Sequence, residues 1–379
     1  MRVLMISPSY FPIKGGAETV IKNLSIKLTQ SGIHTEIMAF NMDYKWKPRW
    51  QGKTEKINGL TVHKIPALNW YPLKHSDRIT LGINLIPGAF RKKLEKNDII
   101  HFHVGDFSFP LFSCNVKKPK IAHFHGPLSF HKRYFLSRLI LNNIADLYIA
   151  ISKNMRKELT ELGVKPNKIR YLPNAVDTDI FHPIEQKEEN VLLFVGRITF
   201  SKGVHVLLNS LQHIKTKTHL VIIGPPDWDL QYFKNFQNQV DYENRKGFHK
   251  ITYLGVQEEE NIVKWCQKAS IFILPSFREA FGVAILEALS CATPVVATNI
   301  PGIRDAVINH KNGLLVSENN PSELAASIQY LLDNKPLRNQ FGKEGRKTVL
   351  ENFSYKTAIN TLCNIYKDLS QNHTSPKTQ

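Results

Sequence analysis

The sequence predicts an α/β protein made of two domains, each built on a doubly wound parallel sheet. Its 379 residues suit two domains of about 180 residues each. Short β-rich runs alternate with helical stretches in both halves of the chain, as expected for parallel strands joined by crossover helices. A polar segment, 183–190, separates the halves and is typical of a linker.

The expected elements follow this alternation along the chain. In the first half, strands are expected at residues 2–7, 35–39, 99–103, 121–125 and 147–151, and helices at 17–31 and 133–143. In the second half, strands are expected at 191–195, 220–223, 251–254, 271–274, 294–297 and 314–316. We therefore expect an N-terminal domain over 1–185 and a C-terminal domain over 190–354. A last helix, 355–370, is expected to cross back to the N-terminal domain, with a disordered tail over 371–379.

The net charge of +18 is concentrated in the first half. Residues 1–180 contain 28 Lys/Arg and 13 Asp/Glu, whereas residues 181–379 contain 22 and 19. A basic surface attracts nucleic acid, anionic lipid or phosphorylated substrates. The sequence carries no nucleic-acid-binding signature, so we expect no nucleic-acid partner. No apolar run is long enough to span a bilayer, and four dispersed cysteines without a CxxC pair are typical of reduced thiols in a cytoplasm.

Two glycines, Gly15 and Gly16, follow the first expected strand and open the first expected helix. Glycine lets a ligand approach the backbone closely, and a helix start offers free N–H groups to a phosphate. A plain strand-to-helix turn would have the same sequence. The spacing is not that of GxGxxG, which argues against a dinucleotide cofactor such as NAD.

A pair of cations follows the expected strand 191–195. The segments Gly196-Arg197 and Ser201-Lys202-Gly203 place an arginine and a lysine on a short loop before the next helix. Two fixed cations at a ligand-binding edge would stabilise the negative charge that builds up on a departing nucleoside diphosphate. The alternative is a surface loop on which both side chains are merely solvated.

Two acidic residues, Glu279 and Glu287, follow the expected strand 271–274. On one continuous helix they would lie on different faces. If the helix begins near Gly282, Glu279 sits in the preceding turn, and the N–H groups of Ala280, Phe281 and Gly282 point at a bound phosphate. The neighbours of Glu287 are apolar, so its carboxylate needs partners. The alternative for Glu287 is a solvated helix residue.

His125 ends the expected strand 121–125. Strand alternation puts His123 and His125 on the same side of the sheet, and the terminal position puts His125 at the edge where such sheets bind ligands. The alternative is a structural histidine. His101 and His103 end another strand in the same way but are weaker candidates.

Taken together, these motifs resemble glycosyltransferase family 4, which has the GT-B fold of two Rossmann-like domains facing across a cleft. The resemblance covers nearly the whole chain in register. It is carried by Gly15-Gly16, the strand ending in His125, Tyr171-Leu172-Pro173-Asn174-Ala175-Val176-Asp177, Gly196-Arg197 to Lys202-Gly203, Glu279 to Glu287, Thr293-Pro294-Val295-Val296-Ala297-Thr298 and Pro301-Gly302. It implies a retaining transferase that moves a hexose or N-acetylhexosamine from a nucleotide sugar, UDP favoured over GDP, to a glycan or lipid-linked acceptor in cell-surface polysaccharide or glycolipid synthesis.

The resemblance also implies roles for single residues. Arg197 and Lys202 would hold the diphosphate, and Glu287 the ribose. Glu279 would hold the transferred sugar, together with the backbone of 280–282. His125 would contact the sugar. Gly16 would close over the phosphates, and backbone near Val256 would read the base. These assignments make His125, Glu279, Arg197 and Lys202 the expected catalytic residues.

In the family, the acceptor is usually proposed to attack from the leaving group's own face, so no protein nucleophile is expected. This sequence departs from the family pattern at Ala175, Ala292, Pro301 and Asp305, where the family usually has Gly, Gly, Gly and Glu. The last two changes affect the detail of the phosphate and sugar contacts.

No cofactor and no metal ion are expected. Asp227-Trp228-Asp229 and Asp177-Thr178-Asp179 match the Asp-x-Asp motif of the other major glycosyltransferase fold. Neither lies where that fold holds its metal.

Several segments of the basic half mix aromatic and cationic residues, as membrane interfaces do. They are residues 45–50, 70–74, 91–93 and 130–135. We expect peripheral docking onto an anionic membrane surface from the cytoplasm. The alternative is a basic face with packed loop aromatics.

Other functions stay open at this point. An epimerase or a sugar phosphorylase could use the same fold, although no cofactor lysine for a phosphorylase is identifiable. An inactive partner subunit of a transferase complex would be expected to lack the basic or the acidic pair, and here both pairs are present.

Overall fold

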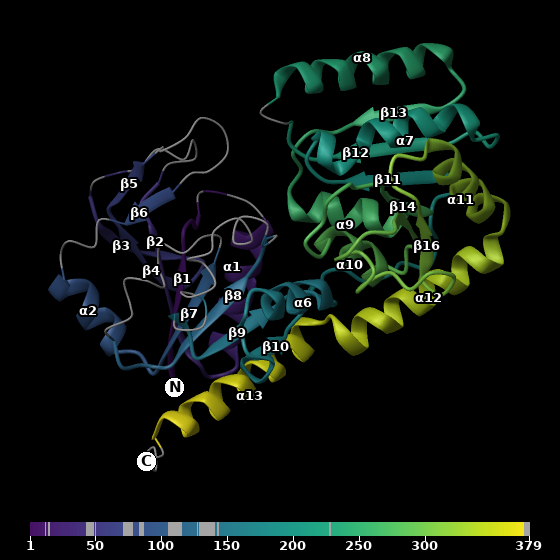
Figure 1. Ribbon diagram of the computed structural model, residues 1–379. Helices are drawn as coiled ribbons and strands as arrows, with labels where there is room; N and C mark the ends of the chain where they lie inside the picture. Colours follow the sequence, from purple (N-terminus) through teal and green to yellow (C-terminus); the bar gives the residue numbers. More distant parts are fainter. Residues whose placement is uncertain are drawn as a thin grey trace. The chain divides into compact units, whose positions relative to one another are not determined.

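The computed structural model (Figure 1) describes the chain except for some loops and the end of the tail. The residues outside the description are 12, 14, 15, 43–48, 50, 71–78, 83–86, 105–115, 127, 129–140, 142, 143, 227, 228 and 375–379.

The chain divides into two compact units. The first consists of Met1–Pro173 and Ala358–Gln379, and the second of Asn174–Thr357. The boundary between the two units, after Pro173, therefore lies earlier in the chain than the expected boundary at 185–190. Lys187 donates hydrogen bonds to Thr293 Oγ1 at 2.6 Å and to the Gln267 carbonyl at 2.9 Å, and Glu189 pairs with Arg338. These contacts make the polar segment 183–190 part of the second unit.

The first unit contains an eight-stranded sheet with the order β10-β9-β8-β7-β1-β2-β4-β3. Its strands are β1 (Arg2–Ser7), β2 (His34–Phe40), β3 (Lys53–Ile57), β4 (Leu60–Ile65), β7 (Ile99–Val104), β8 (Lys120–Phe124), β9 (Leu147–Ala150) and β10 (Ile169–Tyr171). Only β3 runs antiparallel to its neighbour in this sheet. A separate hairpin joins β5 (Ala67–Trp70) to β6 (Ile79–Gly82). The helices described in this unit are α1 (Gly16–Gln30), α2 (Pro87–Glu95), α6 (Lys153–Glu161) and most of α13 (Tyr355–Thr374).

The five strands expected in the first half correspond to β1, β2, β7, β8 and β9, and the sequence reading missed β3, β4, β5, β6 and β10. The β3–β4 turn contains Asn58 and Gly59 with φ of 51° and 77°, the positive values that a two-residue hairpin turn requires. The expected helix 133–143 falls almost entirely outside the described residues. Residues 371–374, expected to be disordered, extend α13 instead, because the segment contains no helix breaker before Pro376.

The second unit contains six parallel strands with the order β13-β12-β11-β14-β15-β16. They are β11 (Val191–Val195), β12 (His219–Ile223), β13 (Lys250–Tyr253), β14 (Ile271–Leu274), β15 (Val295–Thr298) and β16 (Gly313–Val316), each within one residue of its expected position. This is the doubly wound order 3-2-1-4-5-6; the sequence predicted a doubly wound parallel sheet but not its strand order. The strand order therefore reverses between β11 and β14.

The helices of the second unit cover this sheet (Figure 1). They are α7 (Val204–Ser210), α8 (Leu230–Lys246), α9 (Glu259–Lys268), α10 (Val283–Ser290), α11 (Pro321–Asp333) and α12 (Lys335–Asn352). The residues of β11 and β14 are almost all fully buried, as expected for strands with helices on both faces. Within the described residues, no helix is both long and apolar enough to cross a membrane.

Candidate active site

The predicted phosphate-binding residues of the second unit lie where the strand order reverses. Lys202 ends the 3₁₀ turn Phe200–Lys202 after β11, and Glu279 lies in the loop after β14. Lys202 Nζ donates a hydrogen bond to Glu279 Oε2, and both side chains are mostly buried. In doubly wound sheets, ligands bind outside the carboxyl ends of the strands at this reversal. The structure therefore brings together two of the residues that the sequence selected.

Close backbone packing holds the loops after β11 and β14 together. Gly203 has φ of 70°, and a Cβ at this position would lie 1.9 Å from the Pro275 carbonyl oxygen. The Phe277 N–H donates to the Ser201 carbonyl at 2.9 Å. Only glycine fits at 203, since any larger residue would push the two loops apart.

An aromatic stack that sequence reasoning missed joins the same two loops. The Phe200 ring lies nearly parallel to those of His205 and Phe277, with centroid distances of 4.7 and 5.2 Å. Phe200 is 61% exposed. The sequence signal for this stack is weak, because the aromatic residues come from separate segments. Phe200 belongs to the same 3₁₀ turn as Lys202, so the stack borders the candidate site.

Helix α10 presents a set of free N–H groups beside Glu279. Gly282 caps the helix in the left-handed region, with φ of 78° and ψ of 65°. Among the described residues, the N–H groups of Ala280, Phe281 and Gly282 have no hydrogen-bond acceptor. Such a turn at a helix start is suited to binding an anion. The Phe281 side chain is buried and makes an edge contact with Phe353, so only its backbone faces a ligand.

Glycine is also required where the loop after β15 meets this turn. A Cβ on Gly302, whose φ is 90°, would lie 2.4 Å from the Glu279 carbonyl oxygen. Pro301, where the sequence departs from the family pattern, precedes Gly302, and the glycine that this close packing requires is still present. Ala292 is a second departure from the family pattern, and its φ is 54°. Because glycine adopts such a left-handed backbone without steric cost, this conformation explains why the family usually has glycine near this position.

Glu287 lies in α10, one turn beyond the helix start, and is half-buried. Burial raises the pKa of its carboxyl group to about 7, and the nearby charge of Glu259 acts in the same direction. The structure gives the carboxylate no hydrogen-bond partner among the described residues. A partly desolvated carboxyl group without partners is a candidate ligand-binding group.

Arg197 and Val256 follow β11 and β13 at the same edge of the sheet. Arg197 is exposed and has no ion pair within the described part of the chain, so its guanidinium group is available to a ligand. Val256 is 64% exposed. The preceding residue, Gly255, has φ of 66° and accepts a hydrogen bond from the Gly224 N–H at 2.8 Å. The structure gives Arg197 no side-chain contact with Lys202, Glu279 or Glu287.

His125 lies in the first unit, one residue after β8, rather than in the strand as expected. It belongs to a group of four histidines at the ends of β7 and β8. His103 Nδ1 lies 2.7 Å from His125 Nε2, and His101 Nε2 lies 3.3 Å from His123 Nδ1. Burial lowers the pKa of His125 to about 4. The ring is therefore neutral near pH 7.

The glycine loop of the first unit is only partly described. Gly15 lies outside the described residues. Gly16 begins α1 and is exposed, and a Cβ there would meet no atom within 4 Å. Glu18, which the sequence reading overlooked, is buried in the first turn of α1 and accepts a hydrogen bond from the Ser9 hydroxyl. This contact ties the helix start to the loop after β1.

Neither Asp-x-Asp segment forms a metal centre among the described residues. Asp229 caps α8 by accepting a hydrogen bond from the Tyr232 N–H at 3.0 Å, and Asp177 accepts from the Asp179 N–H at 3.2 Å. Residues 227 and 228 lie outside the description. The group with metal-ligand spacing in the described part of the chain is His101, His103 and His123.

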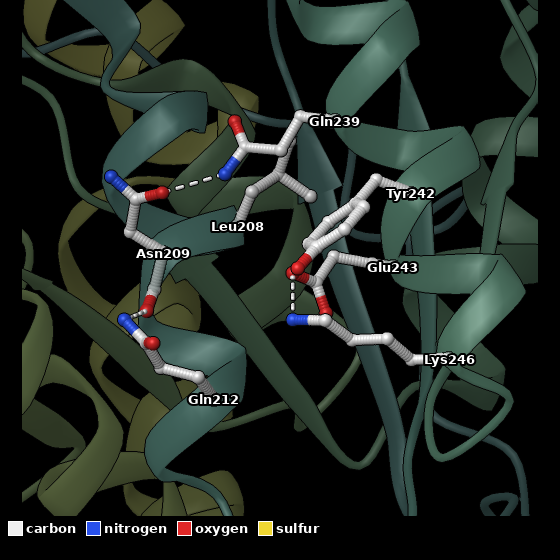
Figure 2. Close-up of a pocket in the computed structure, with 7 residues that line it drawn as sticks. All are labelled: Leu208, Asn209, Gln212, Gln239, Tyr242, Glu243 and Lys246. Atoms are coloured by element: carbon white, nitrogen blue, oxygen red, sulfur yellow. Dashed lines mark hydrogen bonds and ion pairs between the residues drawn. The ribbon is translucent and has the colours of Figure 1, made fainter.

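A cavity of about 340 Å³ lies between α7 and α8 and is distinct from these residues (Figure 2). Gln239 donates to Asn209 Oδ1 at 2.6 Å, and Lys246 donates to Glu243 at 2.9 Å. Most of the lining residues lie in the C-terminal parts of α7 and α8, the helices that precede β12 and β13. None of the predicted site residues lines this cavity, so it is not the predicted site.

Comparisons with known proteins agree with this architecture. Residues 14–180 match the family described as Glycosyltransferase Family 4, and residues 176–348 match the one described as Glycosyl transferases group 1. An uncharacterized glycosyltransferase of Methanocaldococcus jannaschii is 27% identical and covers 98% of this chain and 99% of its own. The O-antigen chain mannosyltransferase C of Escherichia coli is 24% identical, with 97% and 99% covered.

A solved structure, that of Anabaena HepE in complex with UDP, has a TM-score of 0.79 at 18% identity and covers 97% of this chain and 100% of its own. At this identity the likeness supports the fold alone. Two matching family models that together extend from residue 14 to residue 348, and relatives aligned over nearly the whole chain, lead to one conclusion. This chain is a glycosyltransferase with the GT-B fold, whose first half matches Glycosyltransferase Family 4 and whose second half matches Glycosyl transferases group 1.

Proposed function

We propose that this glycosyltransferase moves a hexose or N-acetylhexosamine from a nucleotide sugar to a glycan or lipid-linked acceptor, with retention of anomeric configuration and without a metal ion. The observation that carries the proposal is the arrangement of Lys202, Glu279 and the free N–H groups of 280–282 where the strand order reverses. This edge combines a cation, a carboxylate and an anion-binding helix start, which are the groups that a sugar diphosphate needs.

Each residue has a proposed task. Arg197 and Lys202 bind the diphosphate and stabilise the charge that develops as the sugar departs. An ammonium group has three donors, so Lys202 can contact a phosphate and still donate to Glu279. Glu279 accepts from hydroxyl groups of the transferred sugar. Glu287 accepts from the ribose hydroxyls.

UDP is the favoured nucleotide in this proposal. The HepE structure contains UDP, although its sequence identity to this chain is low. The base would be read by backbone groups near Val256, which is exposed beside the left-handed Gly255. A screen against UDP- and GDP-sugars tests this preference. We expect UDP-sugars to raise the melting temperature and to be consumed, because a ligand that binds only the folded state stabilises it. If no sugar nucleotide shifted the melting temperature or was consumed, the transferase proposal would be wrong.

Retention and metal independence have separate tests. Product formed from an α-linked donor is expected to show an α-anomeric proton coupling by NMR, since the acceptor attacks from the leaving group's face. Transfer is expected to continue after treatment with EDTA, because Arg197 and Lys202 supply the positive charge. A product with inverted anomeric configuration would contradict retention. Activity that is lost with EDTA and restored by Mg²⁺ or Mn²⁺ would contradict metal independence.

The proposed acceptor is located at an anionic membrane surface. Of the four basic segments, the structure describes side chains mainly at 91–93 in α2, which is cationic without an aromatic residue and in which Arg91 and Lys92 are exposed. Each basic residue near anionic lipid contributes about 1 kcal/mol. Co-sedimentation with phosphatidylserine vesicles is expected at low salt and should weaken as salt increases. Equal sedimentation with neutral vesicles would contradict this docking.

A further inference from the structure

Four histidines form two hydrogen-bonded pairs at the ends of β7 and β8. One pair joins His103 Nδ1 to His125 Nε2 at 2.7 Å, and the other joins His123 Nδ1 to His101 Nε2 at 3.3 Å. The His101 and His103 rings are stacked with a centroid distance of 4.5 Å, and the His123 and His125 rings lie 4.3 Å apart with their planes tilted by 32°. Of the four, His125 alone is partly exposed.

Two ring nitrogens determine where the protons lie. His103 Nε2 and His123 Nε2 are buried and have no hydrogen-bond partner among the residues that the structure describes. A buried N–H without an acceptor is rarer in proteins than an under-satisfied acceptor. Both rings therefore carry their proton on Nδ1, and their Nε2 atoms are bare acceptors. This assignment makes His103 the donor to His125.

The same rule assigns the ring protons of the second pair, His123 and His101. His123 donates from Nδ1 to His101 Nε2. His101 must then carry its own proton on Nδ1, and this nitrogen lies 2.6 Å from the Tyr366 hydroxyl in α13. His101 thus donates to Tyr366. The three donor atoms, on His123, His101 and His103, all have an acceptor within hydrogen-bond distance.

A metal ion is a weaker explanation of the cluster. Ring nitrogens bind metals along the ring plane, and the planes of His101, His103 and His123 lie within 16–34° of one another in the stack. Stacked rings do not aim at a common point. The nitrogens of His101 and His123 that face each other are already occupied by their mutual hydrogen bond.

We propose that His103 is a positioning residue that holds His125 as its neutral Nδ1–H tautomer. Because His125 Nε2 accepts from His103, its proton is on Nδ1, and this N–H is available to donate to a ligand. His125 then serves as a fixed hydrogen-bond donor and not as a general base. This extends the proposed function, in which His125 contacts the transferred sugar. Burial lowers the pKa of all four rings, which keeps them neutral near pH 7.

Ring ¹⁵N NMR on the full-length chain tests the tautomer directly. The signals of His125 and His103 are assigned by their loss in His125→Gln and His103→Leu. We expect both rings to show the Nδ1–H tautomer at pH 7 without any ligand. A His125 ring protonated on Nε2, or one with both nitrogens protonated, would overturn the proposal. Stoichiometric Zn²⁺ or Co²⁺ binding that shifts the His101, His103 and His123 signals together would also overturn it.

Two variants with side chains of similar branching test the positioning role. His103→Asn keeps a side-chain N–H near the place of Nδ1–H, whereas His103→Leu removes it. We expect His103→Leu to admit the Nε2–H tautomer of His125 and to lower kcat roughly tenfold, with His103→Asn close to wild type in both measurements. If both variants lost activity equally and the His125 tautomer stayed unchanged, His103 would have only a packing role. The NMR result does not depend on turnover, so an inactive chain with the expected tautomer would refute the proposed function alone.

Discussion

Glu287 shows how one residue's surroundings can set the conditions for binding. Its carboxyl group is half-buried in α10, and burial together with Glu259 raises its pKa to about 7. A carboxyl group accepts hydrogen bonds from sugar hydroxyls well only when it is ionised. The proposed ribose contact should therefore depend on pH near neutrality.

The affinity for a UDP-sugar is expected to rise with pH. With a raised pKa, most Glu287 is protonated at pH 6 and ionised at pH 8, so the Kd should fall roughly tenfold over this interval if only the ionised form binds. Isothermal titration should use UDP-glucose and not UDP, because a terminal phosphate itself titrates near pH 6. Glu287→Gln should bind with little pH dependence. The same pH dependence in wild type and variant would contradict the assignment.

At the scale of elements, the site depends on glycines that let neighbouring loops touch. Gly203 brings the loop after β11 against Pro275, and Gly302 brings the loop after β15 against Glu279. These contacts fix the backbone that carries Lys202 and the free N–H groups of 280–282. The positions of the cation and the helix start are thus set by packing between loops.

Gly203→Ala is expected to destabilise the protein more than Gly247→Ala. Both positions have similar φ values, 70° and 73°, but a Cβ at 203 would lie 1.9 Å from the Pro275 oxygen, whereas a Cβ at 247 would meet no atom within 4 Å. Gly247→Ala should lose about 1–2 kcal/mol from the left-handed backbone alone. Urea unfolding should show a larger loss for Gly203→Ala, together with weaker binding of UDP. Equal losses would mean that the loop contact is not important for stability.

The sequence predicted the elements best where short, continuous hydrophobic runs alternate with helical segments. All six strands of the second unit were predicted in this way, and a helix start near Gly282, one of the two arrangements considered for Glu279 and Glu287, agrees with α10. The β3–β4 hairpin was missed because β3 is polar and exposed, although Asn58-Gly59 is a recognisable turn. The Lys202–Glu279 contact and the stack on Phe200 were beyond prediction, because strand order brings together residues far apart in the chain.

At the scale of the whole molecule, the buried histidines link folding to pH. Burial lowers the pKa of His101 to about 3 and that of His125 to about 4, and it also lowers the pKa values of His103 and His123 well below their usual range. In the unfolded chain these rings bind protons below about pH 6.5. The unfolded state therefore binds more protons between pH 4 and 6.5, and stability falls as pH decreases through this range.

Lowering the pH from 7 to 5 should lower the stability of the wild-type protein, because the buried histidines bind protons only in the unfolded chain. At pH 5 the shift of His125 alone corresponds to about 2 kcal/mol. The melting temperature, measured by circular dichroism between pH 7 and 5, should fall more steeply in wild type than in His123→Phe, which has one buried imidazole fewer. His213→Phe, a change of an exposed histidine, should retain the wild-type slope. Identical slopes for all three proteins would contradict the link.

In the proposed function, Arg197 and Lys202 are the groups that bind the nucleoside diphosphate. Titration calorimetry with UDP at pH 7.5 tests this directly, comparing wild type with Arg197→Ala and Lys202→Ala. Lys217→Ala serves as the control, because Lys217 is exposed and has no ion pair within the described residues. Since each site cation makes charged hydrogen bonds, each loss should weaken binding about tenfold to a hundredfold, while the control binds as wild type does. UDP binding with wild-type affinity in both site variants would contradict the account.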